Sequence, residues 1–218
     1  MPVSKECVIL LHGLARTDRS MHRLADFLKK AGFFIVNYHY PSTKATVEAL
    51  AEDEIPKALR LCPKNSTIHF VTHSMGGIIV RQYLSKNKID KLGRVVMLGP
   101  PNQGSEVVDS LKSFPGFKFI NGPAGMQLGT KKLNLPKRLP SVDFELGVIA
   151  GSRSINLILS LILPWPNDGK VSVENTKVTG MSDHIVLPVT HPFMMRNKQV
   201  MEQVVTFLKQ GAFKKQSI

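Results

Sequence analysis

The chain has 218 residues, of which 43% are hydrophobic and 21% charged, and this balance is that of a soluble globular protein. The length fits one sizeable domain better than two, so we expect residues 1–218 to form a single domain. The 29 Lys and Arg residues exceed the 16 Asp and Glu residues by 13. They are scattered, without the aromatic-interleaved basic stripe of a nucleic-acid site, so no nucleic-acid partner is expected.

The basic excess would attract an anionic membrane surface weakly. Its densest cluster, residues 131–138, reads KKLNLPKR. A solvated basic surface explains this cluster more simply, and membrane contact is the open alternative. The oligomeric state leaves no sign in the sequence.

The two cysteines, Cys7 and Cys62, lie in apolar surroundings without metal-ligand spacing. We interpret them as buried thiols of a reducing compartment and not as a disulfide framework. The first residues lead into a strand-like run without the pattern of a signal peptide. The most apolar stretch, residues 155–163, has about half the length that spans a bilayer. These features predict a cytoplasmic protein.

Apolar runs and amphipathic segments alternate along the chain. Residues 7–11 are continuously apolar, as in a strand buried on both faces of a parallel sheet. By the same criteria we expect strands at residues 7–11, 33–38, 66–71, 94–98, 144–150 and 185–189, and helices at 20–30, 46–61, 76–86 and 196–209. Short links between them predict an α/β fold with a parallel sheet and right-handed crossovers. Ligands bind such sheets at the carboxyl ends of the strands.

The alternation pauses between residues 99 and 143, a stretch rich in Gly, Pro and Lys. We interpret it as an excursion over the active face, with short helices near residues 106–111 and 125–128. Such excursions commonly shape a pocket. Residues 155–163 could line an acyl pocket or form a lipid-facing lip, but packed core is the simpler interpretation.

Residues 71–77 read VTHSMGG and connect an expected strand directly to an expected helix. A serine at such a corner, here Ser74, has the geometry of a nucleophile elbow. Gly76 and Gly77 leave room for the crossing backbone. Thr72 stands where the usual G-x-S-x-G pattern has its first glycine, and its short side chain still fits. The alternative is a serine that merely caps a helix.

A nucleophilic serine needs a base, and His191 lies just after the last expected strand, where the base belongs. His184 is the rival, but it precedes that strand and should lie at the opposite end of the sheet. The remaining option for His191 is an ordinary surface-loop histidine.

The base in turn needs an orienting acid, and Asp168 follows the strand that ends near residue 150. Its N-D-G segment is also a common turn signal without further meaning. Asp183 and Asp143 each precede a strand and so point to the wrong end, and Glu174 is a weaker reserve.

Two backbone N–H groups should receive the oxyanion. That of Met75 follows the nucleophile, and that of Leu14 follows the first strand and its His12-Gly13 turn. We expect His12 to brace this loop and not to act in catalysis. The seven histidines form no metal-ligand cluster, and no phosphate-binding glycine motif occurs, so neither metal nor cofactor is expected.

Taken together, these motifs resemble the α/β-hydrolase superfamily, and within it the small bacterial esterases and triacylglycerol lipases. The resemblance covers essentially the whole chain and rests on VILLHGL at 8–14, THSMGG at 72–77, PPNQGS at 100–105, NDGKV at 167–171 and TH at 190–191. It implies a three-layer fold with a mostly parallel sheet, and a small-molecule or lipid ester as the substrate. Gly13, His73 and Ser105, with His12, are then neighbours of the pocket.

The resemblance also implies a serine carboxylester hydrolase that works through an acyl-enzyme without a cofactor. Ser74 attacks the ester carbonyl, His191 takes its proton and Asp168 orients His191. An acyltransferase, a thioesterase or an amidase would use the same residues. A non-catalytic binding protein with this fold is the alternative from another class. The acyl chain length is left open.

Overall fold

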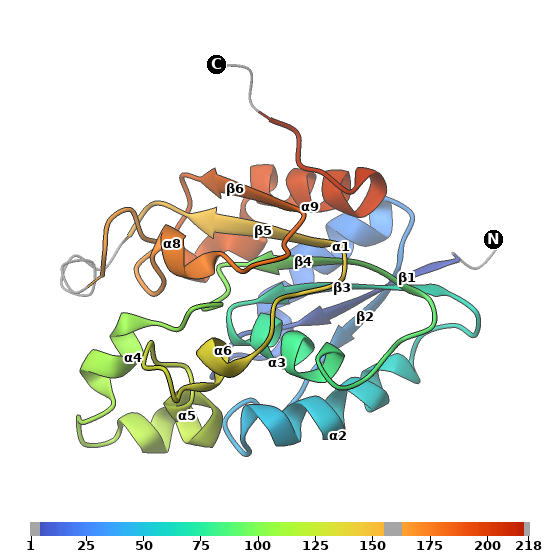
Figure 1. Ribbon diagram of the computed structural model, residues 1–218. Helices are drawn as coiled ribbons and strands as arrows, with labels where there is room; N and C mark the ends of the chain where they lie inside the picture. Colours follow the sequence, from blue (N-terminus) through green and yellow to red (C-terminus); the bar gives the residue numbers. More distant parts are fainter. Residues whose placement is uncertain (1–4, 155–162, 216–218) are drawn as a thin grey trace.

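A six-stranded parallel sheet forms the centre of the molecule, in the order β2-β1-β3-β4-β5-β6 (Figure 1). The computed structural model describes residues 5–154 and 163–215. Within these ranges all five pairs of neighbouring strands are parallel, which confirms the predicted α/β fold class. The strands are β1 (Glu6–Leu11), β2 (Phe34–Tyr38), β3 (Thr67–His73), β4 (Leu92–Leu98), β5 (Leu146–Gly151) and β6 (Asp183–Leu187).

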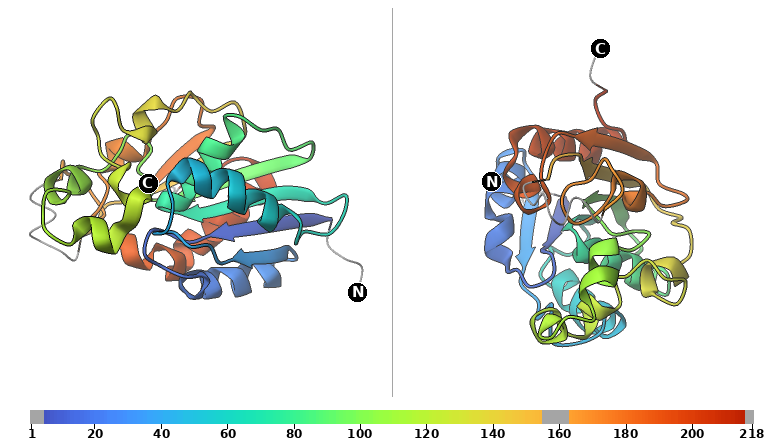
Figure 2. Two further views of the ribbon diagram at one scale, coloured as in Figure 1. Left: turned by 90° about the horizontal axis from the view of Figure 1, so that it is seen from below. Right: turned by 90° about the vertical axis from the view of Figure 1, so that its left-hand side faces the viewer.

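Helices cover both faces of the sheet and give the three layers that were expected (Figures 1 and 2). On one face lie α2 (Val47–Leu59) and α3 (Met75–Leu84), and on the other α1 (His22–Lys30) and α9 (Lys198–Gln210). The 3₁₀ helices η1 (Asp18–Met21) and η2 (His191–Arg196) precede α1 and α9. The four predicted long helices are thereby confirmed.

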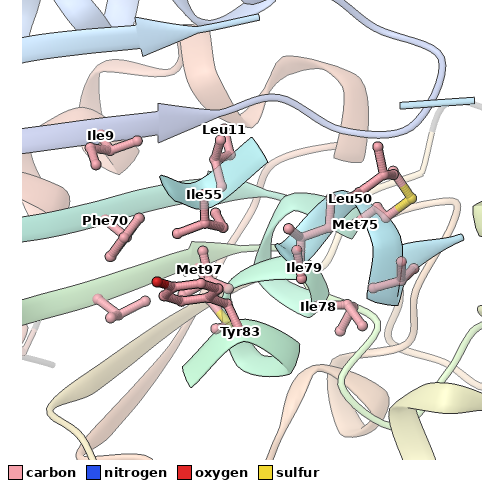
Figure 3. Close-up of a cluster of buried hydrophobic side chains, with 14 of the residues drawn as sticks. Ile9, Leu11, Leu50, Ile55, Phe70, Met75, Ile78, Ile79, Tyr83 and Met97 are labelled. Atoms are coloured by element: carbon pink, nitrogen blue, oxygen red, sulfur yellow. The ribbon is translucent and has the colours of Figure 1, made fainter. Parts of the chain in front are cut away.

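Alternate side chains of the inner strands enter two separate cores. In β1, Ile9 and Leu11 pack with α2 and α3, whereas Val8 and Leu10 pack with α1 and α9. Figure 3 shows the first core, in which Ile55 of α2 meets the sheet. Full burial of one such side chain contributes about 1.5–3 kcal/mol. The continuous apolar sequence of β1 therefore reflects burial on both faces.

Local hydrogen bonds explain where the helices begin and end. The Thr46 side chain accepts the Ala49 N–H at 3.3 Å and caps α2. The Asn197 side chain accepts the Val200 N–H at 3.1 Å and caps α9. At its other end α9 stops at Gly211, whose φ of 76° suits glycine.

The excursion between β4 and β5 lies at the carboxyl ends of the strands (Figure 1). It contains α4 (Glu106–Leu111), α5 (Phe117–Met126) and α6 (Leu135–Arg138). The first has the predicted bounds, whereas α5 is longer than the helix expected near residues 125–128, and α6 was not predicted. The α5 helix kinks at Gly122, where φ is 64° and a Cβ atom would overlap the Thr43 carbonyl.

The last strand differs from its predicted position. We expected residues 185–189, but β6 runs from Asp183 to Leu187 and pairs with β5 over its whole length. Pro188 has no N–H with which to continue the ladder, so the strand ends before it. Between β5 and β6 lies the short helix α8 (Val173–Thr176). The alternatives considered for residues 155–163 fall outside the described residues, apart from the buried Leu163.

The expectation of two free thiols is wrong. Cys7 of β1 and Cys62, just after α2, form a disulfide that encloses a sequence separation of 55 residues. Two lone cysteines so far apart carry no sequence sign of pairing; only the crossover through β2 and α2 brings them together. The argument from reduced cysteines for a cytoplasmic location therefore no longer holds.

Membrane-spanning helices and clusters of metal ligands are both absent from the described ranges. No helix there is long and apolar enough to cross a membrane. Within the same ranges, no group of three or more histidine, cysteine, aspartate or glutamate side chains is placed to hold a metal ion.

Candidate active site

Ser74 occupies the corner between β3 and α3. Its φ of 53° and ψ of −121° are strained for a residue with a side chain, as the elbow motif requires. The Ser74 N–H donates to the Leu98 carbonyl at 2.8 Å and so ties the corner to β4. The strain is therefore held by the neighbouring strand, and the hydroxyl is presented at the carboxyl edge of the sheet.

The two glycines after the serine allow α3 to approach the sheet closely. A Cβ atom on Gly76 would lie 2.8 Å from the Leu11 carbonyl oxygen. One on Gly77 would lie 3.2 Å from the Thr72 hydroxyl and 3.0 Å from the Met97 sulfur. Thr72 thus fits because Gly77 has no side chain, which explains how the motif tolerates its departure from the usual first glycine.

His191 and Asp168 form a buried pair at the same edge of the sheet. Nδ1 of His191 lies 2.6 Å from Oδ2 of Asp168, and the two residues are only 3% and 1% exposed. A backbone hydrogen bond from the His191 N–H to the Asp168 carbonyl, at 3.0 Å, adds a second link. Because a carboxylate only accepts, the proton of the imidazole sits on Nδ1, and Nε2 keeps its lone pair.

The N-D-G-K segment holds the Asp168 carboxylate in position. Its Oδ1 atom accepts the N–H groups of Lys170 at 2.9 Å and Val171 at 2.8 Å, which closes an Asx turn. Ser105 donates its hydroxyl to the Lys170 carbonyl at 2.7 Å and anchors this turn to the excursion. One carboxylate oxygen therefore builds the turn, while the other faces the histidine.

The rival residues lie elsewhere. His184 is at the amino end of β6 and hydrogen-bonds the Thr176 hydroxyl at 3.0 Å. Asp183 accepts the N–H of Phe213 at 2.8 Å, and Glu174 pairs with Lys177 at 2.7 Å. Asp143 precedes β5, also at the amino end. None of these four lines the pocket that contains Ser74.

A pocket of about 260 Å³ brings the predicted site residues together at this edge. The right-hand view of Figure 2 shows the molecule from the side on which the excursion lies. The residues that line the pocket and were predicted for the site are Gly13, Leu14, His73, Ser74, Ser105, Asp168 and His191. The excursion contributes the apolar part of the pocket lining, namely Val107, Val108, Phe117 and Leu128. His12 and the side chain of Met75 do not line it.

The N–H groups of Leu14 and Met75 are available as donors. No hydrogen bond from either group is found within residues 5–154 and 163–215. Met75 is the first residue of α3, where a helix leaves its N–H groups unpaired and its dipole attracts negative charge. Leu14 lies in the turn that the Arg16 N–H closes onto the Gly13 carbonyl at 3.3 Å.

His12 braces this turn from behind. Its Nδ1–H donates to the Gly13 carbonyl at 2.9 Å, and its ring stacks on Tyr40 with 4.2 Å between centroids. The Tyr40 hydroxyl donates to the His12 carbonyl at 2.6 Å. Burial lowers the pKa of His12 below 6.5, so the ring is neutral. Its contacts are those of a structural side chain.

His73 has a contact that sequence reasoning did not find. Its Nε2–H donates to the backbone carbonyl of His191 at 3.0 Å, and the two rings lie 4.7 Å apart. Burial lowers the pKa of His73 well below 6.5, so it is neutral and holds His191 by its main chain. In the sequence, only its position before Ser74 hinted at the site.

Two cationic side chains, Arg16 and Lys170, also line the pocket and were not predicted for the site. Both reach water. The protein around the pocket nonetheless removes part of the hydration of the Lys170 ammonium, and this, followed by the charge of Arg16, lowers the pKa of Lys170. Lys170 belongs to the N-D-G-K motif, but the motif does not indicate that the Lys170 side chain points toward the pocket.

A family model for palmitoyl protein thioesterase matches residues 7–134, which is more than half of the chain. The chain belongs to the palmitoyl protein thioesterase family. The palmitoyl protein thioesterase match includes Leu14 and Ser74 and ends before Asp168 and His191. No curated protein matches the chain.

Solved structures show the same fold. Lipase BlEst2 of Bacillus licheniformis in its propeptide form has a TM-score of 0.77 and 17% identity, over 100% of this chain and 53% of that one. Phospholipase PlaB of Legionella pneumophila has a TM-score of 0.71 and 20% identity, over 95% and 60%. An esterase of Pyrococcus furiosus has a TM-score of 0.64 and 20% identity, over 95% and 82%.

The chain therefore spans about half to three fifths of the length of the first two of these proteins. At these identities the likeness shows the fold alone. The fold and the palmitoyl protein thioesterase match together make the chain a minimal α/β-hydrolase. This confirms the superfamily that the sequence motifs indicated.

Proposed function

We propose that the protein hydrolyses carboxylic esters or thioesters through Ser74, His191 and Asp168. The observation that carries this proposal is the buried 2.6 Å contact between His191 Nδ1 and Asp168 Oδ2, in the same pocket as the strained Ser74. With Nδ1 bound to Asp168, the imidazole of His191 offers Nε2 as the base. The apolar wall suits an acyl chain.

The reaction proceeds in two halves. The Ser74 hydroxyl attacks the acyl carbonyl while His191 Nε2 takes its proton, and the Asp168 carboxylate stabilises the imidazolium that results. The Leu14 and Met75 N–H groups receive the oxyanion, and one such donor is commonly worth about 10²–10³ in rate. The imidazolium returns its proton to the leaving alkoxide or thiolate. Water, activated in turn by His191, then releases the acyl group from Ser74.

The bond that is cleaved can be tested with matched substrates. We would compare p-nitrophenyl esters from acetyl to palmitoyl with acyl thioesters of equal chain length, for the wild type and for Ser74→Ala. The proposal predicts turnover on at least one series and a loss of several decades in kcat in the variant. The better series identifies an oxygen or a sulfur leaving group, and the family match favours the thioester.

Near-normal turnover by Ser74→Ala would overturn the assignment of the nucleophile. If no substrate is turned over, labelling with a fluorophosphonate probe separates the remaining options. Labelling of the wild type but not of Ser74→Ala would indicate an activated serine that acts on another acyl compound. Absence of labelling would favour a binding protein with a hydrolase fold.

We also propose that the α4–α5 tip, residues 113–120, contacts anionic membrane surfaces. Phe119, Ile120 and Phe114 are 93%, 64% and 63% exposed in this short segment. From residue 110 to residue 142 the chain has six basic side chains and no acidic one. Apolar side chains among basic ones match the interface of an anionic bilayer. Phe117 of the same tip lines the pocket, so a lipid ester would reach it directly.

A further inference from the structure

The loops that bear two of the proposed catalytic groups each present a cation to the pocket. Arg16 lies two residues beyond Leu14, and Lys170 lies two residues beyond Asp168. Both side chains line the pocket and both reach water there. The same short turns that position the catalytic groups therefore place two positive charges beside the substrate.

The backbones of both cations are fixed. The Arg16 N–H donates to the Gly13 carbonyl at 3.3 Å. The Lys170 N–H donates to Oδ1 of Asp168 at 2.9 Å, and its carbonyl accepts the Ser105 hydroxyl at 2.7 Å. The backbone turns that carry both side chains are therefore held at the edge of the pocket.

Among the described residues, neither charge lies in a direct ion pair. Within the described part of the chain, no ion pair or side-chain hydrogen bond engages the Arg16 guanidinium or the Lys170 ammonium. The nearby Asp168 carboxylate is already bound by His191 and by two backbone N–H groups. Arg16 lowers the pKa of Lys170, and both cations lower that of His73, so their fields overlap at the site.

We propose that Arg16 and Lys170 bind a phosphate or carboxylate group of the substrate, while its acyl chain lies on the apolar wall of the pocket. The substrate is then an ester or thioester that joins an acyl chain to an anionic head. Two neighbouring cations attract such an anion strongly, and the arginine adds paired donors that match its oxygens. This inference rests on the proposed hydrolase function for its reaction but not for its binding step.

Binding can be measured without turnover. Calorimetric titration would compare n-octyl phosphate with n-octyl glucoside, which has the same chain and a neutral head. For the wild type we expect at least about tenfold tighter binding of the phosphate, with a preference that falls as salt rises. Arg16→Gln and Lys170→Met should each remove most of this preference, and the double variant all of it.

Lys64→Gln is the matched control, because it removes an exposed charge outside the pocket and outside residues 110–142, and it should keep the wild-type preference. Far-UV circular dichroism would verify that each variant is folded. If a variant does not fold, the salt dependence of wild-type binding decides. Equal affinity for both octyl compounds in the wild type, or an unchanged preference in the double variant, would overturn the proposal.

The source of the anionic head can then be identified. Dioctanoyl phosphatidylglycerol supplies its phosphate as a lipid headgroup, and octanoyl-coenzyme A supplies it on a thiol leaving group. The kcat/KM values of the wild type and the double variant would be compared on both. A larger loss on one of them identifies the head. If Ser74→Ala retained turnover while the phosphate preference held, the catalytic assignment would fail and the anion site would stand.

Discussion

Asp168 shows how one side chain can have two separate duties. Its Oδ1 atom organises the turn through the N–H groups of Lys170 and Val171, while its Oδ2 atom faces His191. Its burial keeps water from competing for either oxygen. Changes that keep the turn and alter only the second contact should therefore separate folding from catalysis.

Asp168→Asn makes this separation. The Asn oxygen can still accept the two turn N–H groups, but its amide would face His191 Nδ1 with donors. The imidazole must then carry its proton on Nε2, where it cannot accept the proton of Ser74. We expect kcat on the best ester to fall by about 10⁴ with little change in KM, by analogy with the tautomer effect in other triads. Steady-state kinetics would measure it.

Asp168→Ala is the matched comparison, because it removes the turn bonds as well. It should lose activity and also lower the melting temperature, whereas Asp168→Asn should leave that temperature within a few degrees. If Asp168→Asn kept more than a tenth of the wild-type kcat, the acid would have to be sought elsewhere.

The sequence allowed Ser74, Asp168 and His191 to be nominated because each follows an expected strand, and parallel strands end at one edge. Their catalytic roles stay predictions. The hydrogen bond from His73 to the His191 carbonyl could not be foreseen, since it joins residues 118 positions apart. Arg16 and Lys170 were missed for a similar reason, because the direction of a loop side chain depends on how the loop is folded.

At the scale of elements, strands were easier to predict than the excursion. A strand that is buried on both faces is recognisable in the sequence as a continuous apolar run, as in β1. The α5 helix has no such signature, because Phe119 and Ile120 face water and Gly122-Pro123 normally argues against a helix. The exposed side chains that made this helix hard to predict, Phe119 and Ile120, also form the proposed membrane contact.

Sedimentation with vesicles would test that contact. We expect the wild type to bind vesicles that contain phosphatidylglycerol and not those of phosphatidylcholine alone. Phe119→Ser combined with Ile120→Ser should weaken binding at least about tenfold, because it removes exposed apolar area that would enter the interface. Leu61→Ser is the control, since Leu61 is 56% exposed but follows α2 at the other end of the sheet. Equal binding of the tip variant and the control variant would contradict the proposal.

At the scale of the whole molecule, four histidines outside the proposed catalytic set share a lowered pKa. His12, His69, His73 and His184 all have a pKa below 6.5, and in each the first cause is loss of hydration on burial. Burial in the folded protein therefore favours the neutral form of each of these rings, most strongly for His73. The unfolded chain lacks this burial, so each exposed ring takes up a proton near pH 6.5.

This difference predicts that the protein loses stability as the pH falls below 6.5. In that range the unfolded state binds more protons than the folded state, so the free energy of unfolding rises with pH and reaches its full value above 6.5. His73 alone should contribute up to about 1.4 kcal/mol per pH unit, because one proton is involved. Urea unfolding at pH 5, 6, 7 and 8 would measure the slope. His73→Gln, which keeps a donor for the His191 carbonyl but cannot titrate, should reduce it by about this amount. Unfolding free energies that stay constant between pH 5 and 7 would contradict the prediction, because they would show that the rings have the same pKa in the folded and unfolded states.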